Sequence, residues 1–187
     1  MKKCKDKSYD LAIVDPPYRD SNAPTKSMRK AGQMKTITGR PKKEYWDELL
    51  RISKHQIVFG ANNFQLPPFK GFVVWDKVLP FDFTMSMAEI AAISEDLGTI
   101  SKIYKLRVSG AEVRIHPNQK PVKLYKFLLH TYAKEGWKIF DSHIGSGSIA
   151  VACDDLKFDL DGCEIDEKYY NDAISRLNKA RIQLNIF

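Results

Sequence analysis

A chain of 187 residues, with 43% hydrophobic and 28% charged residues, suits one globular domain with a sizeable core and leaves no room for a second full domain. Cys4, Cys153 and Cys163 lack paired CxxC spacing, so we expect neither a disulfide framework nor a zinc or other metal site. A net charge of +7 suits a partner that carries phosphates without requiring one. No apolar stretch could span a bilayer and no signal-type segment follows the Lys-rich start, so we expect a cytoplasmic protein without membrane contact.

The first predicted strand is the apolar run at residues 11–14, which ends in Asp15-Pro16-Pro17-Tyr18. Each proline fixes its own φ and restricts the residue before it, so this loop can form a stiff pocket wall. Asp15 and the Pro16 carbonyl supply two acceptors for the hydrogens of an amine, and Tyr18 supplies a stacking face for a flat ring. The alternative is a proline-rich turn after a core strand.

A basic segment follows this loop. No acid occurs from Ser21 to Lys43, and we expect residues 19–44 to form a basic loop. Because phosphate contacts supply affinity without reading sequence, a basic loop beside a base pocket predicts contact with a nucleic-acid backbone, and the alternative is a solvated linker. The side chains assigned to that contact are Lys26, Arg29, Lys30, Lys35 and Arg40.

Short apolar runs alternate with helical patterns, which predicts an α/β fold with a largely parallel sheet covered by helices. In the first half, apolar residues at helical spacing in 45–50 precede a strand at 56–59, which gives one βαβ unit. Further strands are predicted at 72–75, 90–94 and 103–108.

The second half begins with a helix predicted after Pro121, a residue suited to a first helical turn. A strand at 138–141, a glycine turn, a helix at 149–156 and a strand at 160–165 predict a second βαβ unit. Apolar residues at helical spacing in 169–177 predict a closing helix.

The glycine turn after residues 138–141 has the features of a nucleotide-binding turn. Gly145 and Gly147 would let a ligand approach the backbone. Glu164 stands 23 residues after Asp141, where a carboxylate can accept hydrogen bonds from ribose hydroxyls. The pattern is not a complete GxGxxG and no P-loop lysine accompanies it, so it favours a nucleoside without a pyrophosphate.

Four motifs in one order carry a resemblance to a known family. They are Asp15-Pro16-Pro17-Tyr18, His116-Pro117-Asn118-Gln119-Lys120-Pro121, the turn at 141–148, and Cys163-Glu164-Ile165-Asp166. The chain resembles, over nearly its whole length, the permuted beta group of S-adenosylmethionine-dependent DNA amino-methyltransferases, which are bacterial or phage-encoded. The resemblance implies a seven-stranded Rossmann-like methyltransferase sheet, mostly parallel with helices on both faces. It divides a single domain, 1–187, into a catalytic half at 1–115 and a half at 116–187 that binds S-adenosyl-L-methionine.

The resemblance also assigns roles to residues. The Asp15-Pro16-Pro17-Tyr18 loop would surround a flipped target base, with Asn62 as a polar pocket residue. The residues placed around the cofactor are Asp141, His143, Gly145, Ser146, Gly147, Glu164, Gln119 and Lys120, with Glu164 on the ribose and Gln119 and Lys120 near the methionine end. Ser142 and His143 stand where the commoner form of the family motif has Pro and Phe. His143 is therefore either the ring that touches the cofactor or a hydrogen-bonded structural histidine.

The tail Gln183-Leu184-Asn185-Ile186-Phe187 has two interpretations. The start of the chain lacks a strand that many relatives carry before the Asp15 loop, so the tail must supply an edge strand or the sheet is one strand short. The tail also resembles the QLxLF-type peptide that docks on the bacterial replication sliding clamp.

An acid at position 15 resembles the adenine-N6 enzymes more than the cytosine-N4 enzymes. We therefore predict a site-specific DNA methyltransferase acting on adenine N6, of the kind found in restriction-modification. The alternatives are cytosine N4, an RNA or a protein amide as substrate, and a catalytically silent nucleic-acid-binding subunit. About two dozen residues separate Ile93 from His116, too few for a large target-recognition domain. Specificity must come from the basic loop, from short segments such as Leu79–Phe83, or from a second subunit, as in a homodimer.

Overall fold

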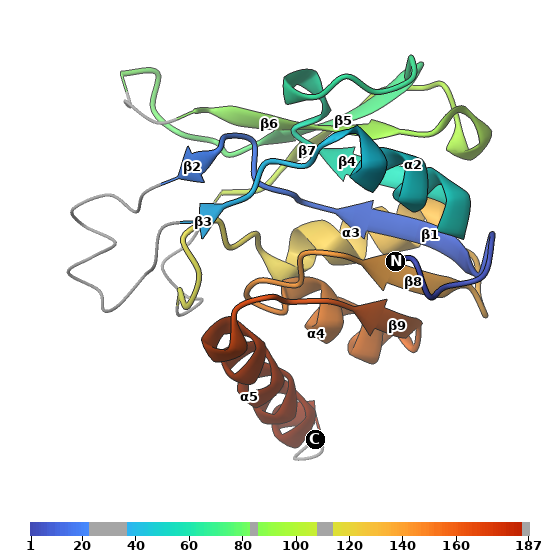
Figure 1. The fold of residues 1–187 in the computed structure, drawn as a ribbon. Helices are drawn as coiled ribbons and strands as arrows, with labels where there is room; N and C mark the ends of the chain where they lie inside the picture. Colours follow the sequence, from blue (N-terminus) through green and yellow to red (C-terminus); the bar gives the residue numbers. More distant parts are fainter. Residues whose placement is uncertain (23–36, 83–85, 108–113, 185–187) are drawn as a thin grey trace.

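The computed structural model describes residues 1–22, 37–82, 86–107 and 114–184. These residues form a seven-stranded sheet with the order β7-β5-β6-β4-β1-β8-β9 (Figure 1). Its strands are β1 (Tyr9–Val14), β4 (Ser53–Phe59), β5 (Gly71–Asp76), β6 (Ala88–Ile93), β7 (Lys102–Lys105), β8 (Lys138–Asp141) and β9 (Asp159–Gly162), and β2 (Ser21–Asn22) pairs separately with β3 (Ile37–Thr38). The helices are α2 (Lys43–Ile52), α3 (Val122–Tyr132), α4 (Ser148–Leu156) and α5 (Glu167–Leu184), with short 3-10 helices η1 (Ala61–Asn63) and η2 (Glu95–Leu97).

Most strand pairs are parallel. β1 pairs in parallel with β4 and β8, β8 with β9, and β5 with β7, whereas β6 is antiparallel to β4 and β5. The mostly parallel α/β sheet and both βαβ units are thereby confirmed, and the β1–β8 pair joins the two halves of the chain. Since β1, β4, β5, β8 and β9 point the same way, their carboxyl ends meet at one edge, on the left in Figure 1.

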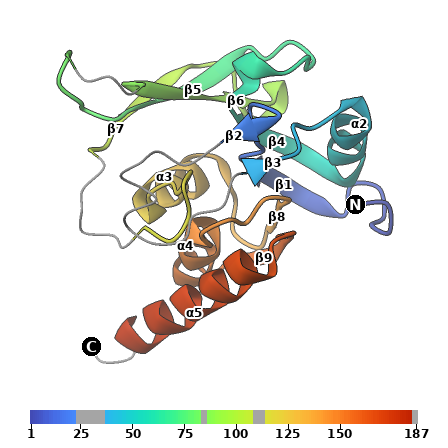
Figure 2. The same cartoon turned by 60° about the vertical axis from the view of Figure 1, so that its left-hand side comes forward.

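Side chains along β1 alternate between two cores. Leu11 and Ile13 pack with residues of α3 and α4, whereas Ala12 and Val14 pack with residues of α2. A central strand buried on both faces is a continuous apolar run, which explains why its sequence signal was clear. Figure 2 shows α2 on one side of the sheet and α3 and α4 on the other, so the prediction of helices on both faces is confirmed.

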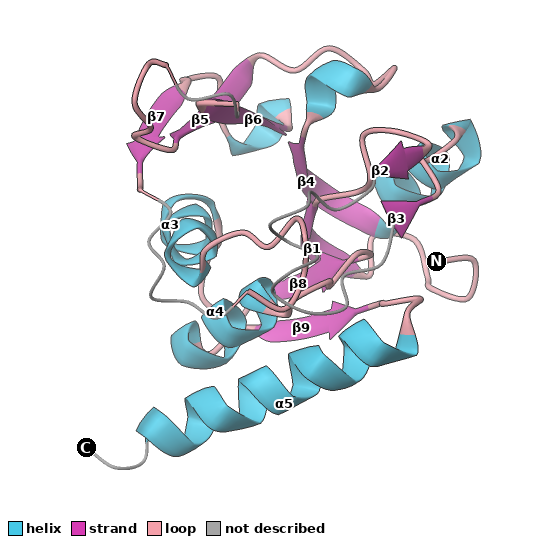
Figure 3. Cartoon of the chain, turned by 90° about the vertical axis from the view of Figure 1, so that its left-hand side faces the viewer, coloured by secondary structure: helices cyan, strands magenta, loops and turns pink. Residues whose placement is uncertain are grey.

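The closing helix α5 continues to Leu184 beside β9 (Figure 3). The expected edge strand is wrong for Gln183 and Leu184, because residues 167–184 contain no glycine or proline that would end the helix earlier. The sheet reaches seven strands without the tail, so it is not one strand short. Residues 185–187 lie outside the described residues. None of the helices in the described ranges is long and apolar enough to cross a membrane.

Three strands end earlier than predicted, β6 by one residue and β7 and β9 by three. β9 ends at Gly162, so Glu164 lies in the loop beyond the strand. The backbone there turns to the loop after β8, because the Ile144 N–H donates to the Cys163 carbonyl at 3.0 Å. β7 ends at Lys105, and residue 108, its predicted end, lies outside the described residues.

Candidate active site at the carboxyl edge of the sheet

The Asp15-Pro16-Pro17-Tyr18 loop leaves β1 at the carboxyl edge of the sheet. Pro16 and Pro17 are buried, which restricts the backbone next to Asp15. The Tyr18 hydroxyl donates a hydrogen bond of 2.8 Å to Asp15 Oδ1. Burial, followed by the charges of Asp15 and Glu89, raises the pKa of Tyr18 far above its ordinary value, so the hydroxyl remains a donor. The loop thus fixes the acid and the aromatic ring relative to each other.

The Tyr18 ring lies against Gly60, the first residue after β4. Gly60 has a φ of +63°, and a Cβ there would lie 2.2 Å from Tyr18 Cε1. Both the left-handed backbone and the ring therefore require glycine. Asn62, the pocket residue expected in this turn, is exposed and does not line the cavity described below. Sequence analysis did not single out Gly60. The feature that could have identified it is a glycine directly after a buried strand.

A row of alternating charges joins this loop to β6. Lys77 Nζ lies 2.7 Å from Glu89 Oε1, and Lys120 Nζ lies 3.1 Å from Glu89 Oε2 and also contacts Asp15 Oδ2. Burial opposes the charge of Lys120, whose side chain is 4% exposed, yet Asp15 and Glu89 outweigh burial and raise its pKa. Lys120, which we expected near the methionine end of a cofactor, thus has two carboxylates of the protein as partners.

A cavity of about 590 Å³ opens at the same edge, a volume within the range of about 300–1,000 Å³ that is usual for ligand sites. Asp15 and Pro17 line it, together with the turn after β8 and the start of α5. Of the predicted catalytic residues, Pro16 and Tyr18 are not among the lining residues. Of the predicted cofactor residues, the cavity is lined by His143, Gly145, Ser146, Glu164 and Lys120, and its lining does not include Asp141, Gly147 or Gln119. Tyr45 and His116 also line it, although sequence reasoning assigned them no site role.

The two glycines of the turn after β8 have different surroundings. A Cβ on Gly145 would lie 3.4 Å from the His116 ring at the cavity, and Gly145 has a φ of +52°. A Cβ on Gly147 would lie 2.9 Å from the Cβ of Ala173 in α5. Gly145 therefore fits the predicted approach of a ligand, whereas Gly147 allows α5 to pack against the turn.

Hydrogen bonds fix the loop between residue 114 and α3 against α4. Gln119 Oε1 accepts the Ile115 N–H at 3.0 Å, so this side chain braces its own loop. The Ser148 hydroxyl donates to the Lys120 carbonyl at 2.6 Å. Arg176 of α5 donates to the carbonyl of Ser146 at 3.0 Å. These contacts set the backbone of Lys120 relative to the glycine turn.

Two carboxylates hold the loop backbone at the cavity. Glu164 accepts the N–H of Gly145 at 2.8 Å and the N–H of Asp166 at 3.0 Å. Asp141, which is 1% exposed, accepts the His143 N–H at 2.9 Å. Burial raises the pKa of Asp141 to about 8, and the charges of Asp15 and Glu164 act in the same direction.

Asp141 should make stability depend on pH. Its pKa is about 8 in the folded chain against an ordinary value of 3.8, so its stabilising contribution is complete below about 4 and is lost as the pH rises through 8. We expect Asp141→Asn, which stays neutral, to lose this dependence. Thermal melts should show the Tm of the wild type falling relative to the variant from pH 5 to about pH 8. A constant difference across that range would contradict the shift.

Two histidines line the cavity as neutral rings. His143 Nδ1 lies 2.9 Å from Ser142 Oγ, and its ring centroid lies 5.5 Å from that of Tyr45. The His116 ring packs on Tyr169 at a centroid distance of 4.5 Å. Burial lowers the pKa of both histidines to about 4, so both are neutral at pH 7. His143 is thus a hydrogen-bonded histidine that also lines the cavity.

Arg40 is the one predicted phosphate contact that lies within the described ranges. Its guanidinium contacts the carbonyl of Asn63 and lies 5.7 Å from the ring centroid of Phe64. The Phe64 ring is 6.2 Å from that of Tyr18, so Arg40 lies near the Asp15 loop. The other predicted contacts, Lys26, Arg29, Lys30 and Lys35, lie outside the described residues.

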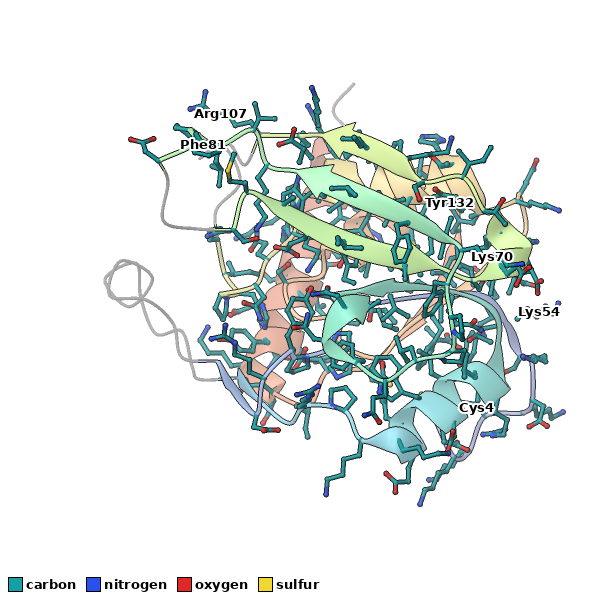
Figure 4. The ribbon with its side chains drawn as sticks, turned by 90° about the horizontal axis from the view of Figure 1, so that it is seen from above. Cys4, Lys54, Lys70, Phe81, Arg107 and Tyr132 are labelled. Atoms are coloured by element: carbon teal, nitrogen blue, oxygen red, sulfur yellow. The ribbon has the colours of Figure 1, made fainter. Side chains whose placement is uncertain are left out.

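The connection between β5 and β6 contains an exposed aromatic residue, Phe81. Phe81, within the predicted specificity segment, is 94% exposed. Figure 4 shows it at the left end of the molecule, opposite Lys54 and Lys70. Phe83 lies outside the described residues. The described part of this segment therefore presents an apolar side chain to solvent.

Two sequence comparisons find similar proteins. The model of a DNA methylase family matches residues 2–175. The type II methyltransferase M.HindIII of Haemophilus influenzae is 34% identical over 77 residues, which are 41% of this chain and only 25% of that protein.

Solved structures match most of the chain. The M1.HpyAVI–SAM complex superposes with a TM-score of 0.63 at 19% identity, over 95% of this chain and 91% of that one. The PvuII DNA methyltransferase (cytosine-N4-specific) gives a TM-score of 0.61 at 11% identity, over 96% and 86%. At these identities the likeness shows the fold.

Proposed function

Because the chain belongs to the DNA methylase family whose model spans residues 2–175, we propose that it transfers a methyl group from S-adenosyl-L-methionine to the exocyclic N6 amine of adenine in DNA. One observation carries the proposal: Asp15, Gly145 and Glu164 line the same cavity. An acceptor for an amine and a turn suited to a nucleoside therefore face one space.

The lining of the cavity fits S-adenosyl-L-methionine. Glu164 is an acceptor suited to ribose hydroxyls, and Gly145 lets a ligand approach the backbone. The neutral rings of His116 and His143, with Tyr45, offer flat faces for an adenine moiety. The bound cofactor supplies an electrophilic methyl group on a sulfonium. A neutral aromatic lining suits the nucleoside part of S-adenosyl-L-methionine, and this supports the proposed cofactor.

The protein's part is to prepare the amine. The lone pair of an exocyclic amine is delocalised into the ring, so the amine is a weak nucleophile. Asp15 and the Pro16 carbonyl, by each accepting one N–H, would favour a more nucleophilic geometry and stabilise the developing positive charge. Asp15 already accepts from Tyr18 and contacts Lys120, but each carboxylate oxygen has a second lone pair for the substrate. The base must leave the duplex to reach this site.

Adenine is favoured by the acid at position 15, and cytosine N4 is the alternative. The test is transfer of radiolabelled methyl from S-adenosyl-L-methionine to unmethylated DNA, followed by mass spectrometry of the nucleosides. We expect N6-methyladenine. N4-methylcytosine would assign the alternative base, and an absence of any methylated DNA nucleoside would overturn the proposal.

Glu164 is expected to contribute to cofactor affinity. Glu164→Gln removes the negative charge but keeps the shape, so a ribose loses a charge-assisted hydrogen bond. Either the Gly145 or the Asp166 amide also loses its acceptor, because the new NH₂ group can only donate. We expect the Kd for S-adenosyl-L-methionine to rise by about 10- to 100-fold, measured by calorimetry. Glu135→Gln, an exposed acid in the turn before β8, is the matched control and should leave the Kd unchanged. Equal affinities in all three proteins would refute the role.

Arg40, with Lys26, Arg29, Lys30 and Lys35, is proposed to contact DNA phosphates, which predicts affinity that falls with salt. Docking of the tail 183–187 on a sliding clamp, and a homodimer, remain predictions.

A further inference from the structure

Glu89 reaches the site from a strand that no sequence motif connects to it. It stands second in β6, opposite Trp75 in the register with β5. Because β6 runs antiparallel to β4, the start of β6 lies at the carboxyl edge, next to the Asp15 loop. Glu89 is not part of the cavity lining, so a role for it in methyl transfer would be exerted through other side chains.

Three donors share the Glu89 carboxylate. Lys77 Nζ lies 2.7 Å from Oε1, while Lys120 Nζ lies 3.1 Å and the Tyr18 hydroxyl 3.5 Å from Oε2. Two of these donors, Lys120 and Tyr18, also contact the carboxylate of Asp15. Lys120, with three N–H groups, can therefore serve both carboxylates at once, whereas the single hydroxyl hydrogen of Tyr18 goes to Asp15, the nearer acceptor.

The charges of Glu89 and Lys120 explain why the two side chains pair. Burial would raise the pKa of Glu89, but Lys120 and Lys77 outweigh burial and lower it to about 2, so the side chain is ionised at neutral pH. Lys120 is faced by Asp15 from the loop, by Glu89 from β6 and by Tyr125 from α3. The Lys120 ammonium also lies 4.5 Å from the centroid of the Phe59 ring. Without Glu89, this buried ammonium would have Asp15 as its remaining ionic partner.

We propose that Glu89 is a positioning residue, which accepts part of the hydrogen bonding of Lys120 so that the Asp15 carboxylate keeps a lone pair for the amine in the cavity; this rests on the proposed function. If Glu89 loses its charge, the Lys120 ammonium can direct a further N–H to Asp15 and occupy the lone pair that the substrate amine needs. Glu89 is absent from the cavity lining, so it would not contact the cofactor directly.

The test compares Glu89→Gln, Glu89→Asp and the double variant Glu89→Gln/Lys77→Met with the wild type. We expect Glu89→Gln to lower kcat about 10²-fold while the KM for S-adenosyl-L-methionine stays within about threefold. Glu89→Asp keeps the charge and should restore part of the rate. The double variant removes the unpaired Lys77 charge, so it should regain stability but not kcat. If the double variant recovers the wild-type kcat, Glu89 acts only by stabilising the fold, and the proposal is overturned.

A second measurement does not depend on turnover. Crystal structures of the wild type and of Glu89→Gln can be compared for the acceptors that Lys120 Nζ contacts. In Glu89→Gln, Lys120 Nζ should leave residue 89 and contact both oxygens of Asp15, because its second charged partner is lost. Glu95→Gln, an exposed acid in η2, is the matched control and should keep the wild-type contacts. A Lys120 side chain that stays in its wild-type position in Glu89→Gln overturns the inference, whether or not the wild type methylates DNA. A wild type that methylates no DNA would by itself refute only the proposed function.

Discussion

Replacement of Asp15 by Asn is expected to lower kcat for methyl transfer by at least about 10³-fold. The Asn side chain keeps the size of Asp15, but it loses the negative charge that would stabilise positive charge on the amine. One of its two terminal groups is an NH₂ donor, which cannot accept an N–H from the substrate. Single-turnover measurements with saturating cofactor would isolate this step from binding.

The variant is expected to bind the cofactor normally. Gly145 and Glu164 make their contacts without Asp15, so the Kd for S-adenosyl-L-methionine should stay within about threefold. Asp96→Asn, an exposed residue of η2, is the matched control for loss of one aspartate and should retain the wild-type rate. A rate for Asp15→Asn within about tenfold of the wild type would show that Asp15 does not accept the amine.

Features with a local signal could be predicted from the sequence. The run at 11–14 is apolar on both faces because β1 is central in the sheet, and the helix after Pro121 begins where a proline suits the first turn. The turn containing Gly145 was found for the same reason, since strand, small residues and helix are consecutive in the chain. The ends of these elements were displaced, as at Gly162, and the short β2–β3 pair within the predicted loop at 19–44 was not predicted.

Features that depend on tertiary pairing could not be predicted from one sequence. Glu89 and Lys77 belong to the site because β5 and β6 fold back beside β4, and nothing in their local sequence shows this. The tail was expected to form a strand because the start of the chain lacks one that many relatives carry, but the helical run before the tail continues through Leu184. Gly147 matched a ligand-binding pattern, yet its neighbour is Ala173, which stands 26 residues further along.

Gly60 is the position at which one methyl group should cost the most. In Gly60→Ala the new Cβ would lie 2.2 Å from Cε1 of Tyr18, and the φ of +63° is itself unfavourable for alanine. The Tyr18 ring must move, and its hydroxyl then leaves Asp15 and Glu89. We expect a loss of about 3 kcal/mol in the free energy of unfolding, from backbone strain and overpacking together. We also expect kcat to fall about 10²-fold.

Gly136→Ala separates the effect of backbone strain from the effect of overpacking. Gly136 has a similar φ of +77°, but a Cβ there would meet nothing within 4 Å. This control should therefore lose only about 1 kcal/mol, from the backbone alone, and keep the wild-type kcat. Chemical denaturation and kinetics below the unfolding midpoint would measure both variants. If Gly60→Ala and Gly136→Ala lose equal stability and both retain activity, the position of the Tyr18 ring against Gly60 matters neither for stability nor for catalysis. If only Gly60→Ala loses activity, the place of that ring is part of the catalytic geometry, since the two variants share the same backbone strain.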